Sequence, residues 1–366
     1  MEEPQKEPAS GEKAVEKIVE TEVTSHSCSL SHRRKYAFFS SDPSSHALLS
    51  VSLLVSILAN IVLVLLLLIP QAHHLQRTAQ LPQNFSLLYP PFSDLSREEF
   101  LEIREEYTIN YLPLKESILA SVEVSSSQEY AFYFSDLNSG ASIGYNEKET
   151  FYSGSLRKVP LLVAALKKIE EEELTWETPI TILPEDLNPY SGPLYRKGAG
   201  YALTMRELLN YTTFYSDNTA AAALLRIVGN KDVVDVMFNM GLSYQTFVGN
   251  KGNVDRYPLS AKEFSRTFRN LYYSSILLRR NSQFILESLA HTNFMEGIPA
   301  GIPADVVVSH KTAYFLEGSH YHDCGIVYYP RNPYILCVMT SGMSEQEANQ
   351  LMSMISEMVY AYVISH

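Results

Sequence analysis

The sequence predicts an α/β (α+β) fold, with one antiparallel sheet flanked by helices, an all-helical subdomain and a single transmembrane helix in front. Strand-like runs lie at both ends of the region from residue 97 onward, and helical patterns lie between them. The two ends can therefore form one sheet, with the helices as an insert. A charge-free apolar run at 47–69 predicts the transmembrane helix.

Length and charge limit the class of protein. The chain has 366 residues, of which 46% are hydrophobic, and its formal charge is -12. This length suits one large domain or two modest ones. Nucleic-acid-binding proteins normally carry a basic face, so no nucleic-acid partner is expected. The three cysteines, at positions 28, 324 and 337, do not make a disulfide framework.

The N-terminal quarter of the chain divides into a tail, a membrane span and a linker. Residues 1–46 are polar, begin with many glutamates and are expected to form a disordered cytoplasmic tail. The run at 47–69 is long enough to cross a bilayer, whereas a cleaved signal peptide has a shorter apolar core near the N-terminus. We therefore expect an uncleaved signal anchor, followed by a linker at 70–96 and a domain at 97–366.

The flanking charges predict the orientation of the span. Arg33, Arg34 and Lys35 precede it, whereas Arg77 alone follows it closely. Positive residues favour the cytoplasmic side, so the N-terminus is expected in the cytoplasm. The predicted location is the cell membrane, with a single pass through the bilayer and an extracytoplasmic catalytic domain.

Each element from residue 97 onward has its own signal. Strands are indicated by alternating or continuous apolar runs, helices by capping patterns and apolar periodicity, and turns by Pro, Gly and Asn. In order, we expect a mostly helical stretch at 97–124, strands at 130–134 and 141–145, helices beginning at Ser155, Thr204 and Thr219, helices at 259–278 and 282–290, strands at 306–308, 325–329 and 334–340, and a last helix at 344–364.

The first chemical motif is Ser155-Leu156-Arg157-Lys158. On a helix, Ser155 and Lys158 share a face, and the helix N-terminus favours an anionic serine oxygen. A lysine can take the serine proton if burial or neighbours lower its pKa. The alternative for an isolated motif of this kind is a capping serine followed by a solvent-exposed lysine.

Two further motifs follow. In Ser216-Asp217-Asn218 the serine can relay a proton and the amide can bind a substrate carbonyl, although all three residue types also cap helices. In Lys311-Thr312-Ala313 the first two side chains can hold a substrate carboxylate, and backbone N–H groups can bind an oxyanion. The alternative for the third motif is an exposed strand end.

The order and spacing of these motifs resemble the class A β-lactamases and related D,D-peptidases, the penicillin-recognising serine enzymes. The resemblance begins near Glu129 and reaches the C-terminus. The stretches that carry it are YAFYFSDLNSG, FYSGSLRKVPLL, YSGPLYRKGAGYALTMRELLNYTTFYSDNTAAAALL and VVVSHKTA. It implies a β-lactamase-like fold, a serine acyl-enzyme and no metal or organic cofactor.

The resemblance also implies roles for individual residues. Ser155 would be the acylated nucleophile, Lys158 its base and Ser216 the proton relay. The implied substrate contacts are Asn218, Lys311 and Thr312, with Tyr190 at the pocket mouth and the N–H groups of Ser155 and Tyr314 forming the oxyanion hole. For Tyr190, a plain surface tyrosine is the alternative.

Three departures from the family pattern stand out. Ala313 replaces the glycine that normally ends the third motif, so its methyl group can crowd a ligand. The loop GNKGNVDRYPLS has Asp255 but no glutamate to activate a deacylating water, while Glu263 falls in the next helix. Cys324 stands where the strand often carries an arginine that meets the substrate carboxylate. His320, His322 and Asp323 before it read as a solvated turn, and the alternatives are a histidine that substitutes for the arginine or binds a metal.

We therefore expect a membrane-anchored serine hydrolase that acts on a β-lactam or a D-alanyl-D-alanine-type amide. The expected partners are that β-lactam or peptidoglycan stem-peptide substrate and the lipid bilayer at 47–69. A cell-wall D,D-carboxypeptidase or transpeptidase is one alternative, and a penicillin- or peptidoglycan-binding module without turnover is another. Cys324 and Cys337 lie on one predicted hairpin, either as a disulfide or as two buried thiols.

Overall fold

The structure is a computed structural model. It describes residues 56, 57, 60, 87, 88, 109–243, 257–315, 317, 319–330 and 332–366. The chain divides into two units, Met1–Gln71 and Ala72–His366. In the first unit, the Asn60 side chain donates a hydrogen bond to the Ser56 carbonyl over helical backbone. The second unit holds the fold and the site described below.

Several predicted features lie outside the described residues. These are the tail at 1–46, nearly all of the expected span at 47–69, nearly all of the linker at 70–96, and the loop containing Asp255. Within the described part of the chain, none of the helices combines the length and the apolar character that crossing a bilayer requires.

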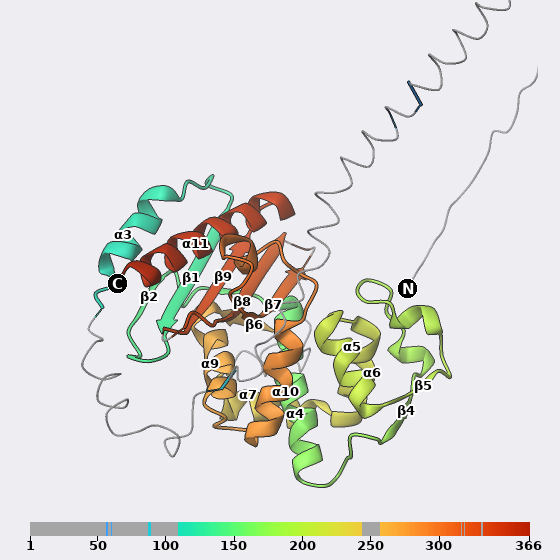
Figure 1. The fold of residues 1–366 in the computed structure, drawn as a ribbon. Helices are drawn as coiled ribbons and strands as arrows, with labels where there is room; N and C mark the ends of the chain where they lie inside the picture. Colours follow the sequence, from blue (N-terminus) through green and yellow to red (C-terminus); the bar gives the residue numbers. More distant parts are fainter. Residues whose placement is uncertain are drawn as a thin grey trace, which may run out of the picture. The chain divides into compact units, whose positions relative to one another are not determined.

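A five-stranded antiparallel sheet joins the two ends of the second unit, as the sequence predicts (Figure 1). Its strand order is β2-β1-β9-β8-β7. The strands are β1 (Glu129–Asp136), β2 (Ser142–Tyr145), β7 (Val308–Phe315), β8 (His320–Val327) and β9 (Tyr334–Ser341). Phe132 of β1 lies opposite Val338 of β9, about 200 residues later in the chain.

Helices cover both faces of this sheet. One layer contains α3 (Leu112–Ser121) and α11 (Glu345–Ser365), and the other contains α9 (Ala261–Tyr272) and α10 (Arg279–Ala290) (Figure 1). Successive strand residues point to opposite faces, so Ala131 packs in the core with α9 and α10, and Phe132 packs in the core with α3 and α11. Both faces of the central strands are therefore buried.

The helical subdomain is built around α4 (Lys158–Glu170). This helix is buried on all sides from Lys158 to Leu166, as expected for a central helix. It packs against α5 (Met205–Phe214), α6 (Asn218–Val228) and α7 (Asn230–Asn239). The predicted capping box at the start of α5 is present, because Thr204 and Glu207 exchange side-chain-to-backbone hydrogen bonds.

Some predicted boundaries were wrong. The strand predicted at 325–329 begins at His320, so His320, His322 and Asp323 are buried strand residues and not a solvated turn. Pairing with β7 on one side and β9 on the other buries these polar side chains. The helix predicted at 259–278 begins later than expected. Residues Pro258–Ser260 form the strand β6, and Ser260 then caps the start of α9.

One α-helix and three short strands in the described part of the chain were also not predicted. They are α7 and the short strands β3 (Thr150–Tyr152), β4 (Pro179–Thr181) and β5 (Ala202–Thr204). β3 pairs with β6, and β4 pairs with β5. Each of these strands has three residues, which is too short to show an alternating pattern.

Cys324 and Cys337 lie directly opposite each other on β8 and β9. Both are buried and both are free thiols. Burial raises the pKa of the Cys324 thiol well above its usual value. Of the two alternatives left open by the sequence, the structure contains the pair of buried thiols.

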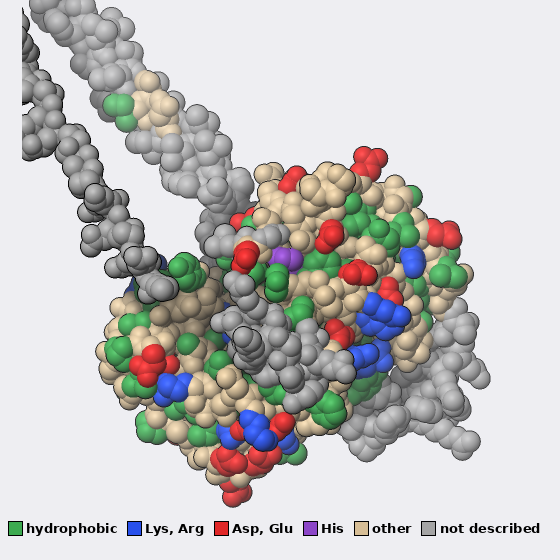
Figure 2. Space-filling model, turned by 180° about the vertical axis from the view of Figure 1, so that it is seen from behind, with side chains coloured by type: hydrophobic (Ala, Val, Ile, Leu, Met, Phe, Trp, Pro, Cys, Tyr) green, Lys and Arg blue, Asp and Glu red, His purple; other side chains and the backbone are tan. Residues whose placement is uncertain are grey.

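Charged groups of both signs share the surface of the second unit. On the face shown in Figure 2, acidic and basic side chains lie interspersed among apolar and polar ones. Among the described residues, exposed ion pairs include Lys231 with Asp235 at 2.5 Å and Arg206 with Glu177 at 3.7 Å. Exposed pairs of this kind contribute little to stability.

Candidate active site

The turn that carries Ser155 packs directly against β7. β3 leads into a 3-10 turn, Gly154–Arg157, which continues into α4. Gly154 has φ +48°, and a Cβ atom there would lie 2.9 Å from the carbonyl oxygen of Tyr314. Glycine therefore allows the backbone of this turn to approach the end of β7, which brings the two predicted oxyanion-hole residues, Ser155 and Tyr314, close together.

The buried side chain of Lys158 links two of the three motifs. Its Nζ atom lies 3.1 Å from Ser155 Oγ, as the shared helix face predicts. The same atom donates to Asn218 Oδ1 at 2.6 Å and to the carbonyl oxygen of Ser216, and it lies 3.2 Å from Ser216 Oγ. The amine is thus held between the predicted nucleophile and the predicted proton relay.

The Ser-Asp-Asn segment both caps a helix and faces Lys158. Asp217 provides the cap: its carboxylate accepts hydrogen bonds from the N–H of Ala220 at 2.9 Å and of Leu194 at 2.7 Å. Burial raises the pKa of this carboxyl group, and these hydrogen bonds partly oppose the shift. Ser216 and Asn218 point instead toward the Lys158 amine. The capping role therefore applies to Asp217, and the catalytic role applies to Ser216 and Asn218.

Ser191 fixes the backbone of this segment. Its hydroxyl donates to the Ser216 carbonyl at 3.0 Å, and its own carbonyl accepts from the Asn218 N–H at 2.9 Å. Ser216 has φ +50°, a left-handed conformation that is uncommon for serine and that such contacts stabilise. Sequence analysis assigned no role to Ser191, although it lies in the stretch from Tyr190 that carries part of the family resemblance.

Lys311 approaches Ser216 from β7. Its Nζ donates to Ser216 Oγ at 2.9 Å and to the Thr312 carbonyl at 2.8 Å. Its side chain is almost fully buried, with 2% of the residue exposed. Burial lowers the pKa of Lys311 to about 7, although nearby Asp323 partly opposes the shift. All three motifs therefore meet around the hydroxyl of Ser216.

The lowered pKa of Lys311 predicts a pH-dependent stability. Between pH 7 and about 10, unfolded Lys311 still binds a proton that the folded protein has released. Stability should therefore rise with pH across this window, by at most about 1.4 kcal/mol per pH unit. Urea unfolding of the wild type and of Lys311→Met at several pH values checks this. Equal pH slopes for the two proteins would contradict the prediction.

A cleft of about 350 Å³ opens at the meeting point of the motifs. Its lining includes the predicted site residues Ser155, Ser216, Thr312 and Tyr314. Ala313 also lines it but is largely buried against the turn at Gly154. Lys158, Lys311 and Asn218 lie behind this lining and contact it through the hydrogen bonds described above.

Tyr190 lies outside this group. It is 79% exposed, and it is not among the described residues that line the cleft. Its backbone N–H donates to Asn188 Oδ1 at 3.1 Å. This hydrogen bond orients the backbone of the loop and does not involve the tyrosine ring. A contact between this ring and a substrate remains a prediction.

Residues without a motif complete the cleft. They come from the segment before η6 (Ile298–Gly301), from β8 and from α11, and include Phe294, Glu296, Tyr321, His322, Glu345 and Asn349. The His322 ring donates to the Tyr152 carbonyl and accepts from the Thr340 N–H. Burial lowers the pKa of His322 to about 4, so the ring is neutral at pH 7.

A buried contact between a histidine and a carboxylate supports the cleft wall. His310 Nδ1 lies 2.8 Å from Asp323 Oδ1, and the other carboxylate oxygen accepts from the Ile298 N–H at 2.8 Å. A Cβ atom on Gly297 would lie 2.5 Å from the same oxygen, so only glycine permits this close approach. Asp323 thus holds the segment next to Glu296 against the sheet. Among the described residues, no group of His, Cys, Asp and Glu is arranged to hold a metal ion.

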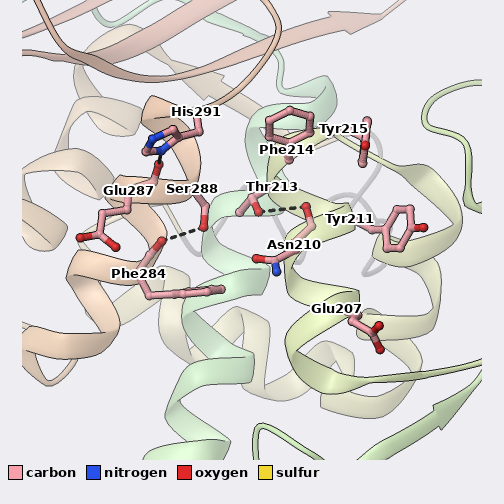
Figure 3. Close-up of a pocket in the computed structure, with 10 residues that line it drawn as sticks. All are labelled: Glu207, Asn210, Tyr211, Thr213, Phe214, Tyr215, Phe284, Glu287, Ser288 and His291. Carbon is pink, nitrogen blue, oxygen red and sulfur yellow. Dashed lines mark hydrogen bonds between the residues drawn. The ribbon is translucent and has the colours of Figure 1, made fainter. Parts of the chain in front are cut away.

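A second cavity, of about 530 Å³, lies between α5 and α10 (Figure 3). Aromatic side chains line much of it, including Tyr211, Phe214, Tyr215 and Phe284. Phe214 and Tyr215 directly precede Ser216 in the chain. None of the predicted site residues is in this lining, so the cavity is separate from the cleft that contains Ser155.

Comparison with known proteins gives the family. A model of the beta-lactamase enzyme family matches residues 113–363, which is more than half of the chain and includes all three motifs. The chain belongs to this family. The resemblance drawn from the motifs is therefore confirmed, and so is the α+β β-lactamase-like fold.

Two named members of the beta-lactamase family show distant similarity to this chain. It is 26% identical to beta-lactamase VEB-1 of Pseudomonas aeruginosa, over 46% of this chain and 63% of that protein. It is 28% identical to beta-lactamase CTX-M-8 of Citrobacter amalonaticus, over 53% of this chain and 69% of that protein. The solved structure of PBP-A has a TM-score of 0.63 and 22% identity, and it covers 70% of this chain and 97% of PBP-A, which shows a shared fold.

Proposed function

We propose that this protein is a serine hydrolase that attacks β-lactam or D-alanyl-D-alanine-type amide bonds through an acyl-enzyme on Ser155. The observation that carries this proposal is the placement of one buried amine, Lys158 Nζ, within hydrogen-bonding distance of both Ser155 Oγ and Ser216 Oγ. The named beta-lactamases among its relatives support a β-lactam as substrate.

The hydrogen bonds suggest how the proton moves during acylation. Two N–H groups of a neutral Lys158 amine can donate to the Ser216 carbonyl and to Asn218 Oδ1. Its lone pair is then directed to the hydroxyl of Ser155 and can accept that proton as Oγ attacks the carbonyl carbon. The carbonyl–nitrogen bond breaks, and the leaving nitrogen receives the proton through Ser216.

In this proposal Ser155 and Tyr314 supply backbone N–H groups to the oxyanion, and Asn218, Lys311 and Thr312 contact the substrate.

Deacylation is expected to be the slow step of the reaction. The loop GNKGNVDRYPLS offers no glutamate to activate water, and Asp255 has a shorter side chain. We therefore expect a long-lived penicilloyl-enzyme and weak β-lactam turnover. This favours the D,D-peptidase alternative for the natural substrate.

Membrane anchoring is a separate part of the proposal. It is supported by the charge-free run at 47–69 and by the preceding Arg33-Arg34-Lys35. In this arrangement the catalytic domain lies outside the cell membrane and the N-terminus lies in the cytoplasm. Protease added to intact cells should digest the catalytic domain, whereas protection of residues beyond 80 would contradict this topology.

One experiment tests the catalytic proposal directly. The full-length protein is incubated with a labelled penicillin, and both attachment and loss of the label are followed by mass spectrometry. We expect an adduct on the Ser155 peptide, no adduct in Ser155→Ala and slow loss of the label. An adduct on Ser153 or Ser216 would overturn the assignment. Turnover of a chromogenic cephalosporin above ~10 per second, a typical enzyme rate, would overturn slow deacylation.

A further inference from the structure

Four aromatic rings line the cavity between α5 and α10. Tyr211, Phe214 and Tyr215 come from α5 and its C-terminal cap, and Phe284 comes from α10. The ring of Phe284 extends from its helix toward α5 (Figure 3). All four residues are partly exposed, so a ligand can reach them. At about 530 Å³, the cavity has the size of a small-molecule site, and its aromatic walls are typical of one.

The charged side chains of this cavity favour a cation. Each wall supplies one glutamate, Glu207 on α5 and Glu287 on α10, and the described lining contains neither lysine nor arginine. Arg206 precedes Glu207 in the chain, but its guanidinium lies against Trp176, 4.4 Å from the ring centroid. Glutamates are negatively charged at pH 7, and the face of an aromatic ring also attracts a cation. The rings and the carboxylates therefore favour the same kind of ligand.

The two walls of the cavity also carry the two partners of one hydrogen bond in the candidate active site. On one side, α5 leads through Tyr215 directly to Ser216. On the other side, α10 is tied to β7, because Ser309 Oγ donates to the Leu286 carbonyl at 2.7 Å, two residues before Lys311. Lys311 Nζ donates to Ser216 Oγ at 2.9 Å. A change in the spacing of α5 and α10 therefore changes the distance between these two groups.

We propose that the cavity between α5 and α10 is a second ligand site, that it takes a small organic cation with an aromatic body, and that its occupation slows acylation of Ser155. The aromatic body fills the space between Phe214 and Phe284, and the ring faces and glutamates hold the cation. The ligand binds the wider spacing of the helices more tightly, so it moves Ser216 away from Lys311 and weakens the proton relay. The binding stands by itself, whereas the effect on acylation rests on the proposed function.

The single tryptophan of the chain reports on this cavity. Trp176 packs edge-on against Phe284, with ring centroids 4.9 Å apart. Its fluorescence is followed in the full-length protein during titration with benzylammonium, with neutral benzyl alcohol and with anionic benzoate. We expect saturable binding of benzylammonium, about tenfold tighter than that of benzyl alcohol, and no saturation with benzoate. Equal affinities for the cation and the alcohol, or no saturable binding of the cation, would overturn the site.

Glutamine substitutions test whether the two glutamates of the cavity hold the cation. Glu207→Gln combined with Glu287→Gln should weaken benzylammonium binding about fivefold and leave benzyl alcohol binding unchanged. Glutamine at position 207 can keep the capping hydrogen bond of α5. Glu177→Gln is the matched control, since this exposed carboxylate is next to Trp176 in the chain but outside the cavity lining. An equal loss in the control would show that the cation is bound elsewhere.

Penicillin labelling in the presence of benzylammonium tests the effect on acylation. At saturation we expect adduct formation on Ser155 to slow about fivefold, with the concentration dependence of the fluorescence titration. An unchanged rate at saturation would overturn the coupling. Slowing that persists undiminished in the double glutamine variant would place the cation in the catalytic cleft and also overturn it. If no adduct forms even without the cation, the proposed function is wrong, while the fluorescence titration still decides whether the site exists.

Discussion

Replacing Lys158 by alanine is expected to slow acylation of Ser155 by about 100-fold or more, the usual effect of losing a general base. The buried amine contacts Ser155 Oγ at 3.1 Å and Ser216 Oγ at 3.2 Å, so no other group in the described site is equally placed to take the serine proton. The measurement is the rate of adduct formation on Ser155 with a labelled penicillin.

A matched control lies on the same helix. Lys167 is on α4 and pairs with Glu170 at 3.6 Å near the surface, so Lys167→Ala should acylate at the wild-type rate. Circular dichroism of both variants shows whether the overall helical content is intact. A folded Lys158→Ala protein that acylates as fast as the control would rule out this lysine as the base.

Replacing Asp323 by alanine is expected to lower the free energy of unfolding by about 2–5 kcal/mol, because it leaves two buried donors unpaired at a cost of about 1–3 kcal/mol each. The substitution leaves the buried His310 ring without its carboxylate partner and removes the acceptor of the Ile298 N–H. Because Ile298 follows the cleft segment at Glu296, acylation should also slow in the folded variant. Urea unfolding and the labelling rate measure the two effects.

A double-mutant cycle with His310→Ala isolates the interaction between His310 and Asp323. If the pair is important, the two single substitutions should cost more in sum than the double substitution does. Asp235→Ala provides the comparison for an exposed carboxylate, because Asp235 pairs with Lys231 on the surface of α7. Equal effects of Asp323→Ala and Asp235→Ala would contradict the prediction.

The sequence was sufficient to predict the motif residues and the sheet that joins the two ends of the second unit. Ser155 and Lys158 are three residues apart at a helix start, so local geometry brings them together. The strands at 130–134 and 334–340 are continuous apolar runs, because both faces of β1 and β9 are buried. In these places local pattern and tertiary packing agree.

In β8 and in the cleft wall, tertiary packing determined the structure rather than the local sequence pattern. His320, His322 and Asp323 are polar and read as a turn, yet two neighbouring strands hold them in a buried strand. The cleft residues Phe294, Glu296 and Asn349 belong to no motif, since their positions depend on how η6 and α11 pack on the sheet. No spacing along the chain encodes such a surface.

The facing thiols of Cys324 and Cys337 make separation of the sheet measurable by simple chemistry. Both are fully buried near the middle of β8 and β9, so an alkylating reagent reaches them when these two strands part. In a Cys28→Ser chain, the alkylation rate would therefore report the free energy of opening at the sheet centre. Measuring this rate and the rate of penicillin labelling at increasing urea concentrations would show whether the catalytic cleft loses its structure before the sheet opens.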